Sequence, residues 1–470
     1  MSIWNMRRIF SLGVVLALTF LLFLPTVRYA LVYDDIEQIA TNPRITSWSY
    51  VPQYFTTHLW AHSTIEPAYY YRPLFLIWLR LVDAILGPPA PIWHLASIVA
   101  HLAATISVFL LVHRLTGCWR ASLFATALFS IHPIHTEAVA WVSSVSEPLL
   151  TALLVLCVYC YAGRKPPISV ASLLFAALAM FTKETGMVAP LLILAYEWTR
   201  STFKNAATAA APYLLPALLF LALRFNALGR LNAATQPNMT VSAMVLTWPR
   251  VLVAYLAHLL WPVHLSVCYD VPVETAIWPF LVMLTILGGL ISVAPKWSAN
   301  VRLGVAWFVI TLLPALAIRY LLTDDYVHDR YLYLPSVGLA LIAAVWFSRL
   351  RFTPPRIVAA GVLAMALCWG TILDLRIWKD EISLFSRAVE VAPGNVYAMN
   401  NLASAYLNAH REAEALPLLQ KVIALRPLDH QGYYNMFRYY QQTGNYAEAE
   451  RYYNICRQMY DASQSAGRAR

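Results

Sequence analysis

The stretch IFSLGVVLALTFLLFLPTVRYALVYDD, residues 9–35, decides the class of this protein and indicates where its chemistry lies. Its first part, 9–30, is apolar except for one arginine and is long enough to cross the hydrocarbon of a bilayer. Two arginines directly precede it and favour a cytoplasmic N-terminus by the positive-inside rule. The acidic pair Asp34 and Asp35 is therefore expected just beyond the far side of the membrane.

The composition indicates a protein that is mostly membrane. Of 470 residues, 60% are hydrophobic and 12% are charged. The core of a water-soluble protein does not require so large an apolar fraction. The formal net charge is +10, but many basic residues lie in short links between apolar runs, where membrane orientation explains them better than nucleic acid does. The six cysteines are scattered and predict neither a disulfide framework nor a zinc site.

Apolar runs recur along the chain and predict about eleven membrane crossings in an all-α polytopic bundle. The predicted crossings are 9–30, 92–112, 119–133, 146–162, 167–182, 186–199, 209–225, 276–294, 303–321, 335–348 and 356–374. With this count, the short links rich in Arg and Lys all fall on the side of the N-terminus.

Two further apolar stretches are left out of this count. The stretch 74–86 contains Arg80 and Asp83, and 251–263 ends in a proline and a valine. Both are expected to lie along the membrane interface or to re-enter it. A full crossing by 251–263 would move later basic links to the acidic side and break the positive-inside pattern.

After the last predicted crossing, the sequence becomes polar and rich in Ala and Tyr, and a period appears. Pro393 and Pro427 are 34 positions apart, as are Tyr406 and Tyr440. This is the spacing of tetratricopeptide helical pairs. Plain helix stacking is the alternative explanation for Tyr and Ala at helical spacing, but the period favours repeats.

The sequence therefore predicts two domains. Residues 1–374 form the membrane domain, and 375–470 form a tetratricopeptide-repeat domain on the non-cytoplasmic side. Two full repeats are expected at 396–429 and 430–463, after a half-repeat at 379–395.

Acids, histidines and basic residues gather in the links predicted on the far side, whereas the cytoplasmic links carry mainly Arg and Lys. Polar groups collected at one water boundary can form a site there. The candidate site residues are Asp34, Asp35, Arg72, His132, His135, Glu137, Glu147, Lys183, Glu184, His328, Asp329 and Arg330.

Residue type assigns a role to some of these side chains. A carboxylate at a membrane surface can take the proton of an acceptor hydroxyl, and twin carboxylates can also bind a cation. An arginine can stabilise the charge on a departing phosphate. Asp34 and Arg72 suit these two roles. The structural alternatives are that paired acids cap helices or stay solvated, and that arginines extend to lipid headgroups.

A metal site is a further alternative within this set. His132, His135 and Glu137 are metal-ligand types, but their spacing matches no standard zinc motif. A hydrogen-bonded network at a helix terminus is favoured for them. The sequence leaves dependence on a divalent cation open.

Several short motifs along the chain together resemble one known family. They are VYDD at 32–35, NP at 42–43, YRPL at 71–74, the pair His94 and His101, ALFSIHPIHTEAVAW at 127–141, KET at 183–185 and RYLYLP at 330–335. In this order they are similar to the transmembrane and tetratricopeptide repeat O-mannosyltransferases and their bacterial relatives. The resemblance runs from the first predicted crossing to the C-terminal repeats.

The resemblance implies a glycosyltransferase of the C-type membrane fold, which takes its sugar from a polyprenyl-phosphate donor and inverts the anomeric centre on the non-cytoplasmic side. The first acid of the first outer loop, Asp34, is then the expected base, with Asp35 beside it. Arg72, Lys183 and Arg330 fall where the family's phosphate-binding residues are expected.

The chain departs from the family pattern at two places. Ser143-Ser144-Val145-Ser146-Glu147 stands where relatives usually carry Gly-Arg-x-Asp, so the arginine is missing and a glutamate replaces the aspartate. Asp329 replaces the usual glutamate before Arg-Tyr-Leu. The short repeat array is consistent with a bacterial relative that has a different acceptor.

The resulting prediction is transfer of a monosaccharide, with mannose as one candidate, to a hydroxyl acceptor that is expected to be protein. The predicted partners are the bilayer, the polyprenyl-phosphate sugar and an acceptor held by the repeats, with no nucleic acid. The predicted location is a bacterial inner membrane with a periplasmic site, or the endoplasmic reticulum membrane in a eukaryote. The rival hypotheses are a membrane transporter and a non-catalytic scaffold that uses the repeats for assembly.

Overall fold

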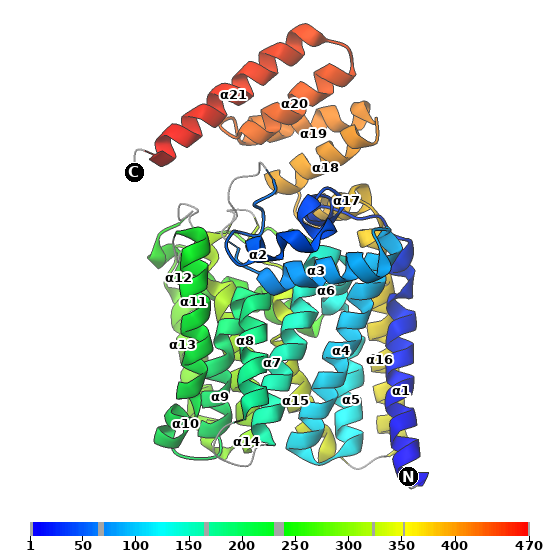
Figure 1. The fold of residues 1–470 in the computed structure, drawn as a ribbon, viewed down its shortest axis with the longest axis vertical. Coiled ribbons are helices and arrows are strands. Elements are labelled where there is room, and N and C mark those ends of the chain that lie inside the picture. The colour runs from blue at the N-terminus through cyan, green and yellow to red at the C-terminus, as the bar shows by residue number, and fades with distance from the viewer. Residues whose placement is uncertain are drawn as a thin grey trace. The chain divides into compact units, whose positions relative to one another are not determined.

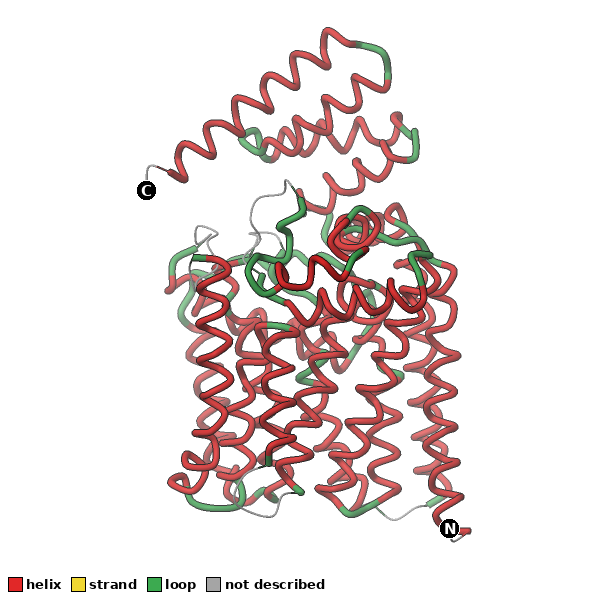
Figure 2. Tube along the Cα trace, in the orientation of Figure 1, coloured by secondary structure: helices red, strands yellow, loops and turns green. Residues whose placement is uncertain are grey.

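The computed structural model describes residues 3–63, 70–163, 169–229, 239–321, 325–350 and 353–468. Within these ranges the regular structure is helical and contains no β-strand, as the predicted all-α class requires (Figure 2). The chain forms two compact units, which are described separately below. The first contains Met1–Leu265, Val273–Leu321 and Asp329–Trp378, and the second contains Ser266–Pro272, Leu322–His328 and Lys379–Arg470.

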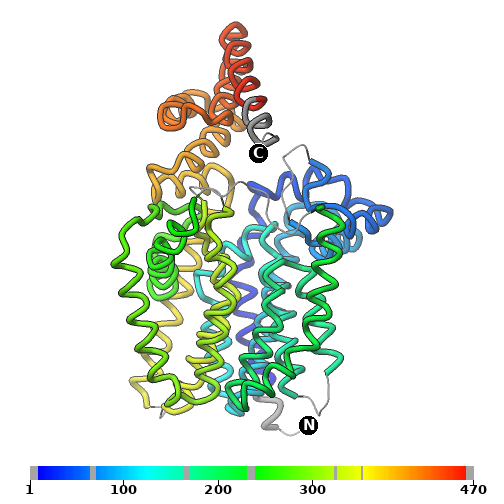
Figure 3. The backbone as a smooth tube through the Cα atoms, turned by 90° about the vertical axis from the view of Figure 1, so that its left-hand side faces the viewer, coloured from blue at the N-terminus to red at the C-terminus, as the bar shows by residue number. Residues whose placement is uncertain are grey.

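Most of the long apolar helices of the first unit run alongside one another as a bundle in two perpendicular views (Figures 1 and 3). Its helices are α1 Ile3–Phe23, α2 Val51–Tyr54, α3 Pro73–Leu86, α4 Ala90–Thr116, α5 Trp119–Ser130, α6 Thr136–Ala140, α7 Ser146–Ala162, α8 Val170–Thr182, α9 Ala189–Trp198, α10 Phe203–Ala210, α11 Leu214–Leu228, α12 Val241–Leu260, α13 Trp278–Val293, α14 Ala299–Leu312, α15 Ser336–Ser348 and α16 Pro354–Leu375. Among them, α4 packs against α5 and α7, and α7 packs against α8.

Each of the eleven predicted crossings falls on helical structure. Among the described residues, eight segments are long and apolar enough to span a bilayer, and seven of these coincide with predicted crossings. Two more predicted crossings fall on the shorter apolar helices α8 and α15. The number of about eleven crossings stays a prediction.

The remaining segment, α12, does not coincide with a predicted crossing. The apolar stretch 251–263 was expected to lie along the interface, whereas the structure forms one helix of 20 residues, Val241–Leu260, that has the length and composition of a span. The reason is that residues 241–250 extend the apolar stretch at its start, and Pro249 is accommodated inside the helix.

The other omitted stretch behaves differently. α3 has 14 residues and lies across the ends of the upright helices, in contact with α4 and α8 (Figure 1). Its buried Arg80 donates to Asp83 at 2.7 Å and to the carbonyl oxygen of Ile45 at 3.0 Å. This arrangement fits the prediction that 74–86 is not a crossing.

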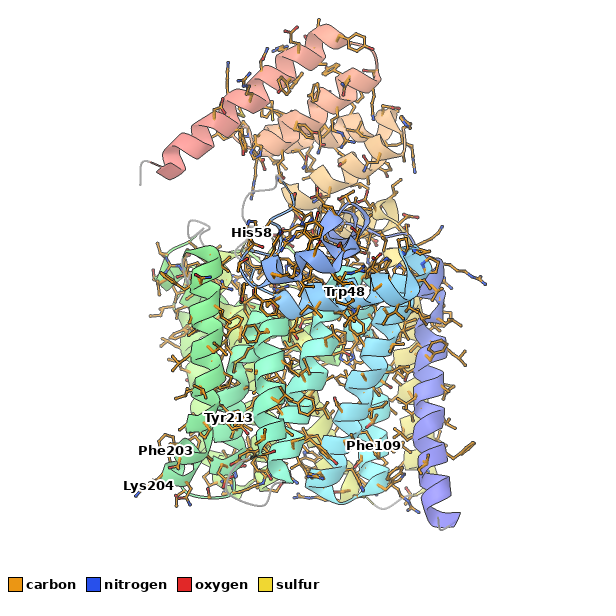
Figure 4. The ribbon with its side chains drawn as sticks, viewed as in Figure 1. Trp48, His58, Phe109, Phe203, Lys204 and Tyr213 are labelled. Carbon is orange, nitrogen blue, oxygen red and sulfur yellow. The ribbon has the colours of Figure 1, made fainter. Side chains whose placement is uncertain are left out.

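The two ends of the bundle carry different segments. Trp48 and His58 lie at the end where α3 crosses the bundle, whereas Phe203 and Lys204 lie at the opposite end (Figure 4). The N-terminus lies at the same end as Phe203 and Lys204 (Figure 1). The basic link that precedes α10 and the chain start therefore share one end, which is the arrangement that the positive-inside argument requires.

The second unit consists mainly of antiparallel helical pairs. Its helices are α17 Glu381–Val391, α18 Val396–Asn408, α19 Glu412–Leu425, α20 His430–Gln442 and α21 Tyr446–Arg468. Asn395 and Asp429, which are 34 positions apart, cap α18 and α20 through their side chains. The predicted period thus appears as a repeated helix start and a repeated pair of helices.

Small and large apolar side chains fill the space between these helices. The buried cluster is Ala403, Leu407, Ala415, Leu419 and Met436. Asn435 on α20 donates to Oδ1 of Asn400 on α18 at 2.9 Å, so a polar contact fixes the register of successive repeats.

Two loop segments that fall within the predicted membrane domain, 1–374, belong to this second unit. They are Ser266–Pro272 and Leu322–His328. Tyr326 donates its hydroxyl to the carbonyl oxygen of Val271, and His328 Nδ1 lies 3.3 Å from the carbonyl oxygen of Val267. The division of the chain in space therefore differs from a single cut after residue 374.

Candidate active site

Three basic side chains each meet a glutamate near the end of the bundle that carries α3. Arg72 Nε lies 2.8 Å from Glu184 Oε2. Lys183 is paired with Glu147, and Arg330 is paired with Glu137. The Glu137 carboxylate also accepts a hydrogen bond of 2.9 Å from the backbone N–H of Arg330. All six residues are among those predicted from the sequence, and their pairing one to one was not predicted.

Local sequence places each cation at a break between helices. Arg72 directly precedes Pro73, which opens α3 because proline needs no hydrogen-bond partner for its nitrogen in a first turn. Lys183 has an extended backbone between α8 and the 3-10 helix Glu184–Val188. Arg330 lies in the 3-10 helix Asp329–Leu332.

Gly186 permits the sharp turn after Lys183. A Cβ atom at this position would lie 2.5 Å from backbone atoms of Ala179 and Met180. Only glycine therefore lets the chain fold back so closely against α8. This turn sets the direction in which Lys183 and Glu184 leave the backbone.

The three cations lie within electrostatic reach of one another. Burial lowers the pKa of Lys183, although Glu147 acts in the opposite direction. Arg72 and Arg330 lower the pKa of Lys183 further, because like charges disfavour its protonated form. The Tyr331 ring lies between two of them, 5.6 Å from Lys183 Nζ and 5.0 Å from Arg330 Cζ.

Asp34 lies close enough to Arg330 and Arg72 for their charges to act on it. Burial raises the pKa of Asp34 to about 7, against the attraction of Arg330 and Arg72. Its side chain is half-buried, and no described residue donates a hydrogen bond to its carboxylate. Asp34 is thus an acid whose oxygens remain available and whose proton affinity suits general base chemistry near neutral pH.

Asp35 is in a different environment from its neighbour. It is fully buried, and its Oδ1 accepts hydrogen bonds from the N–H of Ser143 at 2.7 Å and from the Ser143 hydroxyl at 2.6 Å. Its Oδ2 accepts a third bond from the N–H of Val32 at 3.3 Å. Burial raises the pKa of Asp35 to about 7 despite these bonds. The geometry gives Asp35 an anchoring role for the loop that carries Asp34.

Two of the three predicted histidines, His132 and His135, bond to neighbouring protein groups. His132 Nε2 lies 3.1 Å from the carbonyl oxygen of Leu259, and its Nδ1 accepts the N–H of Ile134 at 3.2 Å. His135 Nε2 lies 3.0 Å from the Ser336 hydroxyl. The described part of the chain contains no group of three or more His, Cys, Asp or Glu placed to hold a metal ion.

The last two predicted residues, His328 and Asp329, belong to different units. Asp329 Oδ1 lies 2.8 Å from Nδ1 of His258 in the first unit. His328 lies in the second unit, where its Nε2 is 3.2 Å from the carbonyl oxygen of Asp325.

Several residues that touch these groups were not predicted. The Tyr70 ring lies 4.5 Å from Arg72 Cζ, and the Trp141 ring lies 4.9 Å from Arg330 Cζ. Arg224 on α11 lies 3.4 Å from Glu184 Oε1. The signal for Arg224 was present in the sequence, since a lone arginine in an otherwise apolar run usually has a buried partner.

A cavity of about 370 Å³ in the first unit lies apart from these residues. Its walls come from the loop after α1 and from the α3–α4 region, and its lining includes Asn42, Asp83 and Trp93. The predicted site residues do not line it.

The chain is similar over most of its length to proteins named as protein O-mannosyl-transferases. It is 25% identical over 422 residues to protein O-mannosyl-transferase F38B6.6 of Caenorhabditis elegans, a match that covers 83% of this chain and 59% of the relative. It is 24% identical to human TMTC1, covering 84% of this chain and 53% of the relative. Mouse TMTC3 is also 24% identical, with 91% of this chain and 52% of the relative covered.

These matches confirm the predicted resemblance, and the chain spans between 52% and 59% of the length of these three relatives. Residues 379–463 match the family of the bacterial transcriptional activator domain, which is similar to tetratricopeptide repeats and supports the repeat fold of α17–α21. No solved structure matches the chain significantly.

Proposed function

We propose that this chain, which resembles protein O-mannosyl-transferases over most of its length, is a membrane glycosyltransferase that acts on proteins. The donor is a sugar linked to polyprenyl phosphate, and the sugar is transferred with inversion to a hydroxyl group. The observation that carries the proposal is that Asp34, an acid with available oxygens, lies within electrostatic reach of Arg72 and Arg330, which in turn act on Lys183.

In the proposed reaction, Asp34 is the general base. The acceptor oxygen forms a bond to the anomeric carbon while its proton passes to the Asp34 carboxylate. The bond between the anomeric carbon and the phosphate oxygen breaks on the opposite face, and polyprenyl phosphate leaves with the electron pair. A single displacement of this kind inverts the anomeric centre.

The cations stabilise the leaving group in this proposal. Charge grows on the phosphate as the glycosidic bond breaks, and fixed positive groups in a partly buried site stabilise that charge effectively. Arg72 uses Nε for Glu184, and within the described ranges no acceptor is bonded to its Nη1 or Nη2. Its two terminal nitrogens are therefore free to bind two phosphate oxygens.

The acceptor is proposed to reach the site from the non-cytoplasmic side and to be held by the second unit. Helical repeats present extended surfaces to polypeptides. Exposed aromatic side chains on the last repeat, Tyr434 and Tyr453, would add apolar contact area for such a segment.

A transfer assay with the purified full chain tests the proposed function. The protein is incubated with a panel of polyprenyl-phosphate sugars and with either a short Ser/Thr peptide or a long unfolded polypeptide. Release of polyprenyl phosphate that depends on the acceptor is the expected result, and the long polypeptide is expected to react at lower concentration. Failure of all donors to react would favour the scaffold hypothesis.

We expect the rate of transfer to depend on pH through Asp34. Its pKa lies at about 7, above the ordinary value for an aspartate, so the carboxylate that accepts the proton is lost as the pH falls through this region. kcat/KM should fall about ten-fold for each pH unit below about 6 and level off above about 8. A profile measured with saturating acceptor checks this, and a midpoint near the ordinary aspartate pKa would contradict it.

A further inference from the structure

Arg224 is a buried arginine in an apolar helix. It lies on α11, which belongs to a segment that is long and apolar enough to span a bilayer, and only 7% of the residue is exposed. A charged group in such a place is costly unless it is paired, and it usually serves a function.

The partner of Arg224 is the glutamate that also binds Arg72. Arg224 Nη1 lies 3.4 Å from Glu184 Oε1, and Arg72 Nε lies 2.8 Å from Glu184 Oε2. The N–H of Tyr71 donates a hydrogen bond of 2.9 Å to Oε1. One carboxylate therefore joins two guanidinium groups from segments that are far apart in the sequence.

Aromatic packing fixes this arrangement from the side of α11. The Phe220 ring, one helical turn before Arg224, lies 5.7 Å from the Tyr71 ring and 5.5 Å from the Phe181 ring. Tyr71 precedes Arg72, and Phe181 lies near the end of α8, close to Glu184. The same face of α11 thus contacts both the segment that carries Arg72 and the segment that carries Glu184.

We infer that Arg224 is a positioning residue, which fixes Glu184 and through it the Arg72 guanidinium for the donor phosphate. This inference rests on the proposed function. Arg72 donates from Nε to Oε2 of Glu184, which restricts the orientation of the Arg72 guanidinium, and Arg224 donates from Nη1 to the other oxygen of the same carboxylate.

The charge balance explains why a second arginine is needed. Burial raises the pKa of Glu184, but attraction by Arg72 and Arg224 outweighs this and keeps it below the ordinary value. When Arg72 binds a phosphate, it shares its positive charge with a second anion. Arg224 then remains as a counter-charge to the buried Glu184 carboxylate. Without it, the carboxylate would be buried with too little positive charge beside it, which is costly.

The experiment measures donor binding and transfer in full-length Arg224→Met, which keeps an unbranched apolar side chain. We expect kcat/KM for the donor to fall about ten-fold and the affinity for polyprenyl phosphate to fall by a similar factor. Arg224→Lys should recover part of both losses. Arg302→Met is the matched control, because Arg302 donates to the carbonyl oxygen of Thr199, four residues before Phe203 at the opposite end of the bundle.

A double-variant comparison separates positioning from a general loss of packing. Glu184→Gln should lower donor affinity, and adding Arg224→Met to it should cause little further loss, because both changes break one chain of contacts. The inference would be overturned if the losses of donor affinity in the two single variants multiplied in the double variant. It would also be overturned if Arg224→Met bound polyprenyl phosphate with the affinity of the wild-type protein. If the wild-type protein itself bound no polyprenyl phosphate, the proposed function would fail together with the inference.

Discussion

The Asp34→Asn variant should fold as the wild-type protein does and lose sugar transfer by about a thousand-fold. An asparagine has the same shape but cannot accept the proton of the acceptor hydroxyl. No described residue donates a hydrogen bond to the Asp34 carboxylate, so the substitution leaves no described donor without a partner. kcat/KM and the thermal unfolding temperature in detergent are the two measurements.

Asp35→Asn is the control for this prediction. Oδ1 of Asp35 accepts two hydrogen bonds from Ser143, and an amide group that presents its NH₂ to these donors would leave them unsatisfied. We expect this variant to unfold at a lower temperature, in contrast to Asp34→Asn. Near-normal transfer by Asp34→Asn would show that the base is another residue or that the chain acts as a scaffold.

The second large effect is expected at the pair of Lys183 and Glu147. Lys183→Met leaves the Glu147 carboxylate buried without its cation, which costs about 3–5 kcal/mol of unfolding free energy. The double variant Lys183→Met with Glu147→Gln removes both charges and should regain most of this stability. Thermal unfolding of the three proteins checks the expected order.

Transfer activity then separates the two roles of Lys183. If Lys183 binds the donor phosphate, the stable double variant stays impaired by about a hundred-fold, since a fixed positive charge is missing in the transition state. Recovery of transfer along with stability would contradict the proposed role and leave Lys183 as a packing residue. The polyprenyl-phosphate assay described above provides the measurement.

Much of the fold follows from the sequence because its signals are local. The apolar run after residue 9 forms α1, and the period of 34 residues forms the pairs α18–α19 and α20–α21. Length, apolarity and spacing report directly on helices. For α12 the structure differs from the prediction in the length of the helix, because residues 241–250 join the apolar stretch that begins at 251 and give the helix the length of a span.

The candidate site could be predicted less completely. Asp34 and Asp35 look equivalent in the sequence, but neighbouring side chains leave the backbone in different directions, and only Asp35 meets Ser143. Which glutamate pairs with which cation depends on contacts between segments more than 30 residues apart in the chain. Arg224 belongs to the same category, because its partner Glu184 is 40 positions away.

Glu137, Glu147 and Glu184 lie against the cations of the site and cancel most of their charge before a donor binds. Local charges that cancel produce only a weak electric field at a distance. The site therefore attracts phosphates and nucleotides dissolved in the surrounding water only weakly. The proposed donor does not depend on such a field, since its hydrocarbon tail already confines it to two dimensions beside the protein. Substrate choice would then begin with the bilayer, before any hydrogen bond to the phosphate forms.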